Sequence, residues 1–199
     1  MTEDEVTRDR ASKDEAAQDG ASNDKQANRQ GQLVVYTGNG KGKTTAALGV
    51  AFRALGRDFR VAVLQFIKGK WKTGERRFAE TLPSLVFEVT GKGFTWESDD
   101  LSRDAQAARQ GWERAKELVG SGSYDIVILD ELTYAINYGF IDLEGVVTCL
   151  KERPGHVHVI VTGRNAPDPL LDAADLVTEM KPIKHPYDRG VPAQIGLDY

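Results

Sequence analysis

The stretch LVVYTGNGKGKTT, residues 33–45, decides the fold. A short apolar run leads into a glycine-rich turn, and helical periodicity continues from Lys43. A strand, loop and helix in this order bind phosphate, because the curled backbone and the helix N-terminus present N–H groups and partial positive charge to an anion. We predict that the triphosphate of ATP is bound by Gly38, Asn39, Gly40, Lys41, Gly42, Lys43, Thr44 and Thr45.

The loop is one residue shorter than the usual motif. The spacing G-x-x-x-x-G-K-[ST] requires glycine at position 37, where this sequence has Thr37. Lys43 supplies a full positive charge, and the hydroxyl of Thr44 suits a magnesium ion, or manganese in its place, on the phosphates. A glycine-rich turn without a ligand is the alternative, and the helix that opens at the Lys-Thr pair argues against it.

A second acidic element lies at residues 126–131, where the apolar run IVIL ends in Asp130 and Glu131. It resembles a Walker B segment, in which Asp130 holds magnesium, directly or through water, opposite Thr44. Glu131 is a candidate to orient a water or a metal ligand. The alternative is that the two carboxylates cap a helix over 132–138. Together with the glycine-rich loop, the pattern favours the metal for Asp130.

From Gln32 onward, short apolar runs alternate with longer amphipathic segments. This pattern predicts an α/β fold, with a mostly parallel central sheet flanked by helices, of the P-loop (RecA-like) NTPase type. Ligands of such sheets bind at the carboxyl ends of the strands. The expected strands are 33–37, 60–66, 85–90, 124–129, 157–162 and 176–179, and the expected helices are 43–56, 74–81, 101–119, 143–152 and 169–174.

Composition limits the class of protein. A length of 199 residues with 40% hydrophobic side chains suits a single domain, expected at 31–199. Residues 1–30 form a polar arm, predicted to be disordered or helical on a partner. A net charge of -4 argues against nucleic-acid or membrane partners. One cysteine and no targeting or membrane segment predict the cytosol.

Several stretches resemble the ATP:corrinoid adenosyltransferases that serve cobalamin synthesis and salvage in bacteria and archaea. They are YTGNGKGKTTAA at 36–47, QFIKG at 65–69, GFTW at 93–96, LDE at 129–131 with YAI at 134–136, and TGRNAP at 162–167. The likeness extends from about Gly31 to Tyr199. It implies that ATP is held in a reversed sense, with the ribose 5′ carbon open to attack and triphosphate as the leaving group.

The resemblance implies transfer of the 5′-deoxyadenosyl group to the cobalt(I) of cob(I)alamin or another reduced corrinoid. Reduced cobalt is itself the nucleophile, so no Ser, Cys or His is needed to attack, and Lys43 stabilises the departing triphosphate. Phe94 and Trp96 are expected to pack on the lower face of the corrin and displace the axial ligand; ordinary packing is the alternative. The resemblance also implies a homodimer and a reductase or flavodoxin as electron donor.

One arginine and the last residues of the chain are further candidates for a functional role, and two other functions compete with adenosyl transfer. Arg164 is a candidate contact for phosphate or ribose, with a solvated surface arginine as the alternative. The last residues, 191–199, look like the ending of the same family, without a chemical role that the sequence reveals. The main competing function is an ordinary P-loop ATPase or phosphotransferase, and a nucleotide-sensing module without catalysis is a third class.

Overall fold

The computed structural model describes residues 29–67, 73–90 and 101–198. Six strands form one parallel sheet in the order β3-β2-β4-β5-β1-β6. The elements are β1 (Leu33–Thr37), α2 (Lys43–Leu55), β2 (Val61–Gln65), α3 (Gly74–Ala79), β3 (Leu85–Val89), α4 (Leu101–Gly120), β4 (Ile126–Asp130), α5 (Leu132–Asn137), α6 (Leu143–Lys151), β5 (His158–Thr162), α7 (Asp168–Ala173), β6 (Leu176–Glu179) and the 3-10 helix η1 (Pro186–Arg189).

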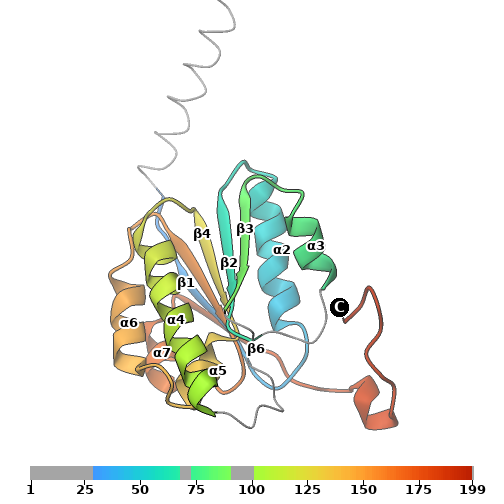
Figure 1. The fold of residues 1–199 in the computed structure, drawn as a ribbon. Coiled ribbons are helices and arrows are strands. Elements are labelled where there is room, and N and C mark those ends of the chain that lie inside the picture. Colours follow the sequence, from blue (N-terminus) through green and yellow to red (C-terminus); the bar gives the residue numbers. More distant parts are fainter. Residues whose placement is uncertain (1–28, 68–72, 91–100, 199) are drawn as a thin grey trace, which may run out of the picture. The chain divides into compact units, whose positions relative to one another are not determined.

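Helices cover both faces of the sheet (Figure 1). Along β4, Ile126 and Ile128 pack against alanines of α2, whereas Val127 and Leu129 belong to the cluster on the other face. Alternate residues of one strand therefore enter different halves of the core, which is why the strand reads as a continuous apolar run. The predicted fold class is confirmed.

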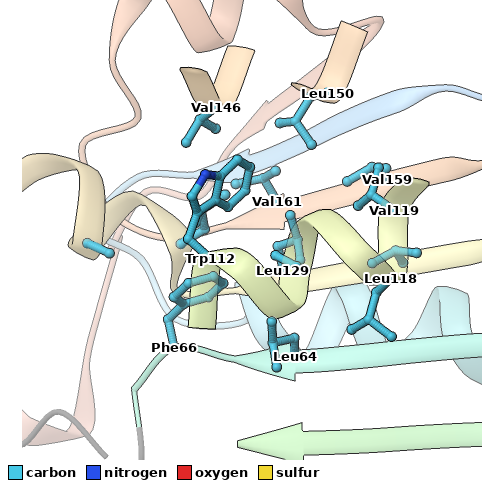
Figure 2. Packing of buried hydrophobic residues seen from close by; sticks show 14 of the residues in the cluster. Leu64, Phe66, Trp112, Leu118, Val119, Leu129, Val146, Leu150, Val159 and Val161 are labelled. Atoms are coloured by element: carbon cyan, nitrogen blue, oxygen red, sulfur yellow. The ribbon is translucent and has the colours of Figure 1, made fainter. Parts of the chain in front are cut away.

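The larger half of the core is built around α4 and α6. Figure 2 shows Trp112 of α4 lying between Phe66, beyond the end of β2, and Val146 of α6. The indole is only 8% exposed. Burial of a side chain of this size contributes about 3–5 kcal/mol relative to alanine. This packing holds α4 and α6 against the sheet and leaves its carboxyl edge free for a site.

The helix and strand boundaries agree with the prediction to within a few residues. The strand expected to end at Leu129 continues to Asp130, because Asp130 still pairs with Gln65 of β2. The helix considered after Glu131 forms as α5. The helix expected over 74–81 ends at Ala79. The 3-10 helix η1 was not predicted, since a proline-containing segment of four residues has no periodicity to detect.

The chain divides into two units, Met1–Gln30 and Gly31–Tyr199. Residues 1–28 lie outside the described part of the chain. The polar arm, disordered or helical on a partner, therefore stays a prediction. In the second unit, the carboxyl ends of β1, β2, β4 and β5 lie side by side in register, with Tyr36 opposite Thr162 and Gln65 opposite Asp130. This edge of the sheet carries the candidate site.

Candidate nucleotide-binding site

The glycine-rich loop between β1 and α2 curls around the side chain of Lys43. Gly38 and Gly42 have φ angles of 95° and 111°, a region that side chains with a Cβ rarely adopt. The ammonium group of Lys43 donates to the carbonyl oxygens of Gly38 and Gly40, both at 2.8 Å. This lysine is 6% exposed. The loop thus curls around one buried cation, and its binding of triphosphate stays a prediction.

The N-terminus of α2 is open to a ligand. Gly42 occupies the capping position, and no side chain caps the helix. The first turn carries no acidic residue. Unpaired N–H groups and the partial positive charge of a helix of 13 residues therefore meet at the loop. An oxyanion with several acceptor atoms, such as a polyphosphate, satisfies these groups.

Thr37 explains why the loop is short. It remains in β1, where it pairs with Glu179 of β6, so the turn begins one residue later than in the usual motif. Its hydroxyl accepts a hydrogen bond from the N–H of Ala166 at 3.1 Å. A glycine at this position has no hydroxyl. Thr37 therefore joins the loop to the segment that follows β5.

Asp130 is at the centre of a buried hydrogen-bond network. Its carboxylate accepts bonds from the hydroxyl of Thr44 at 2.9 Å, from the amide of Gln65 at 3.0 Å and from the hydroxyl of Thr162 at 2.6 Å. The side chains come from three strands and the first turn of α2. Asp130 and Thr44, between which a magnesium ion was predicted, are in direct contact through this hydrogen bond, and the metal itself stays a prediction.

Thr162 connects the two acidic residues. Its hydroxyl donates to Asp130 and accepts a hydrogen bond from the N–H of Glu131 at 3.0 Å. Glu131 has a left-handed backbone, φ 59°, and its side chain makes no capping bond to α5 although it occupies the capping position. Sequence reasoning missed Thr162 and Gln65. Their signal was a polar residue at the carboxyl end of an apolar strand.

Burial and charge shift the titration of the site. Burial raises the pKa of Asp130, and the hydrogen bonds from Thr162, Thr44 and Gln65 oppose this shift. Burial also raises the pKa of Glu131, and the charge of Asp130 adds to the effect. Burial lowers the pKa of Lys43, while the negative charge of Glu131 opposes it. Clustered shifts of this kind are characteristic of functional sites.

Arg164 lies on the segment after β5, and Thr133 and Asn137 of α5 hold its backbone. The hydroxyl of Thr133 donates to the carbonyl of Arg164 at 2.7 Å, and the amide of Asn137 does so at 3.2 Å. The side chain is exposed. Arg164 also lines the cavity together with the loop.

A cavity of about 770 Å³ joins these groups. Its cationic side chains are Lys41, Lys43 and Arg164, and its acidic side chains are Glu75, Asp130, Glu131 and Asp198. Side-chain charge alone therefore does not balance a polyphosphate. A polyphosphate in this cavity would need further positive charge, from N–H groups of the loop or from a cation.

The donor set suits magnesium. Hydroxyl and carboxylate oxygens of Thr44, Asp130 and Glu131 are the hard ligands that this ion prefers, together with substrate phosphates. No cluster of three or more His, Cys, Asp or Glu capable of holding a metal is present in the described residues.

Two predicted site residues, Phe94 and Trp96, lie outside the described residues. The single cysteine, Cys149, lies on α6, is not among the residues that line the cavity, and has a pKa that burial raises. It is therefore poorly suited to act as a nucleophile, since the thiolate is the reactive form. None of the described helices has the length and hydrophobicity needed to cross a membrane.

The sequence is similar to one enzyme family over most of its length. A profile described as ATP:corrinoid adenosyltransferase BtuR/CobO/CobP matches residues 29–199. The corrinoid adenosyltransferase of Escherichia coli K12 is 48% identical over 172 residues, 86% of this chain and 87% of that protein. Corrinoid adenosyltransferase CobA of Salmonella typhimurium LT2 is 47% identical over 170 residues, 85% of this chain and 86% of that protein.

The fold of this chain is also similar to that of a solved structure. The flagellar accessory protein FlaH from Methanocaldococcus jannaschii superposes with a TM-score of 0.54, covering 76% of this chain and 71% of that one. The two sequences are 13% identical. This similarity supports the parallel α/β architecture and carries no argument about function.

Proposed function

The chain belongs to the ATP:corrinoid adenosyltransferase family, and we propose that the cavity at the carboxyl edge of its sheet is where the adenosyl group of ATP is transferred to a reduced corrinoid. The observation that carries the proposal is the short loop that opens α2, with Thr44 of its first turn bonded to Asp130 at 2.9 Å. It supports the proposal because the buried ammonium of Lys43 and the carboxylates of Asp130 and Glu131 line the same cavity as the N-terminus of α2.

The reaction forms one bond and breaks another. The electron pair of cobalt(I) forms the bond to the ribose 5′ carbon, and the pair of the carbon–oxygen bond leaves with triphosphate. The substrate supplies the nucleophile, so the protein has to orient the reactants and stabilise the leaving group. We assign the second task to Lys43, the loop N–H groups and the N-terminus of α2, because they surround the same space.

Thr44 and Asp130 would supply ligands to magnesium, and Glu131 would hold a water or the ion. When bound, it would offset negative charge on the triphosphate. Arg164, which also lines the cavity, is proposed to contact phosphate or ribose. Phe94 and Trp96 are proposed to pack on the corrin. The homodimer, the reductase or flavodoxin partner and the cytosolic location rest on the resemblance and the composition.

The product separates this function from an ordinary ATPase or phosphotransferase, which none of the relatives described above supports. The protein is incubated anaerobically with ATP, magnesium and cob(I)alamin kept reduced, and the products are separated. We expect triphosphate and a light-sensitive cobalt–carbon bond in equal amounts. Formation of ADP without that bond would contradict the proposal, and so would the absence of turnover with fully reduced corrinoid.

Thr162→Val tests how the acidic pair is held. Valine keeps the shape of the side chain but removes the hydroxyl that bonds both Asp130 and the N–H of Glu131. Loss of one buried partner is worth about 1–3 kcal/mol, so we expect the magnesium concentration for half-maximal ATP binding to rise roughly tenfold. Calorimetry without corrinoid measures this value. Thr162→Ser should restore it, and an unchanged magnesium dependence in the valine variant would show that Thr162 does not position these residues.

A further inference from the structure

The C-terminal segment begins and ends at the phosphate loop. Met180, directly after β6, accepts a hydrogen bond from the N–H of Gly40 at 2.6 Å. At the other end of the segment, the carboxylate of Asp198 forms an ion pair with the ammonium of Lys41. Residues 181–197 are thus tethered at both ends to one turn of backbone. The sequence of this ending alone revealed no chemical role.

Asp198 is also the residue around which the tail folds. Its carboxylate accepts a hydrogen bond from the N–H of Gln194 at 2.7 Å, and its own N–H donates to the carbonyl of Gln194 at 2.8 Å. Its side chain is 14% exposed, whereas Ile195 and Leu197 are 83% and 74% exposed. Apolar burial therefore does little to hold the tail. The contacts of Asp198 provide its attachment.

The attached tail forms part of the cavity. Gly196, Leu197 and Asp198 line it together with Lys41 and the first residues of α2 and α3. Leu197 is an exposed apolar side chain on this wall, so a ligand that covers it removes apolar surface from water. The wall also narrows the route by which water reaches the phosphates.

We propose that Asp198 is a positioning residue for ATP: its ion pair with Lys41 holds residues 196–198 as a wall of the nucleotide site. The inference rests on the proposed function in that ATP occupies the cavity. ATP binding and attachment of the tail then stabilise each other, because linkage between two binding events is reciprocal. Lys41 is half exposed, so the effect of the pair is modest.

Asp198→Asn removes the charge and keeps the size of the side chain. We expect the Kd for ATP with magnesium, measured by calorimetry without corrinoid, to rise roughly two- to fivefold. Asp198→Glu should keep most of the affinity because it keeps the charge. Asp188→Asn is the matched control, since Asp188 is an exposed residue of η1 in the same segment and is not among the residues that line the cavity.

Attachment of the tail is measured separately by carboxypeptidase digestion from the C-terminus. ATP should slow digestion of the original protein and of Asp188→Asn, and should protect Asp198→Asn much less. Equal affinity and equal protection in the original protein and Asp198→Asn would overturn the proposal. Neither measurement needs cobalt or adenosyl transfer. Failure of the tail's role is therefore distinguishable from failure of the proposed function.

Discussion

Lys43→Ala is expected to lower kcat/KM for adenosyl transfer by about a thousandfold, the upper range for removal of one charged or hydrogen-bonding group that stabilises a leaving anion. The ammonium lies inside the loop, bonded to the carbonyls of Gly38 and Gly40. No other cationic side chain that lines the cavity is buried in this way in the described structure. Without the charge of Lys43, only the N–H groups and the metal remain to stabilise the negative charge of the departing triphosphate.

The loss of activity in Lys43→Ala has to be distinguished from a loss of the folded state. Lys43→Ala also leaves two loop carbonyls without their donor, so circular dichroism and thermal unfolding accompany the kinetics. Lys116→Ala is the control, because Lys116 forms an exposed pair with Glu113 on α4 and is not among the residues that line the cavity. Lys43→Arg should not rescue activity, since a planar guanidinium does not fit a space made for a compact ammonium. A folded Lys43→Ala protein within tenfold of the original would contradict the assignment.

The loop and the strands were predictable because their signals are local. Glycines, a lysine and a threonine in consecutive positions determine the turn and the start of α2, and each buried strand is a short apolar run. The closeness of Asp130 and Thr44 could also be anticipated, since a magnesium ion shared by the two was predicted. It follows from the rule that the carboxyl ends of parallel strands meet at one edge.

The remaining contacts depend on strand order and on chain ends far apart in sequence. Thr162 reaches Asp130 and Glu131 because β5 lies between β4 and β1, and the sequence alone does not specify that order. Asp198 meets Lys41 after a segment of loops and one 3-10 helix, which has no periodicity to follow. The sequence therefore identified the residues of the glycine-rich loop and of the acidic pair, but not Thr162 and Asp198, which contact them.

Asp130→Asn is expected to remove activity and to stabilise the free protein. The asparagine keeps the shape of the side chain but loses the charge that a magnesium ion requires, so we expect kcat/KM to fall by about a hundredfold or more. Without ligand, the buried carboxylate is a cost to the folded state, because burial outweighs the hydrogen bonds in raising its pKa. The amide of Gln65, which donates to the carboxylate, turns over so that its oxygen accepts from the new amide group. With that bond kept, removing the charge should raise the free energy of unfolding by about 1 kcal/mol, or the Tm by about 2–4 °C for a protein of this size.

If the stabilisation comes from removing the charge of Asp130, the difference in stability between Asp130→Asn and the original protein has to depend on pH in one direction. The folded pKa of Asp130 lies above its unfolded value, so between these two values the folded protein binds more protons and stability falls as the pH rises. The advantage of Asp130→Asn over the original protein should therefore be largest above the folded pKa and shrink as the pH falls through it. Thermal unfolding from neutral to acidic pH measures this difference.

Asp125→Asn is the control for Asp130→Asn, because both aspartates lie in or next to β4. Asp125 is also buried, just before β4, but its carboxylate accepts a hydrogen bond from the N–H of Arg60 at 2.7 Å and lies at the opposite end of the strand from the cavity. This variant should gain no stability and should bind ATP normally. If Asp130→Asn were less stable than the original protein at neutral pH, the carboxylate would belong to the structure of the fold. A gain in stability together with a loss of activity would show that the carboxylate of Asp130 destabilises the folded protein and is needed for ligand binding.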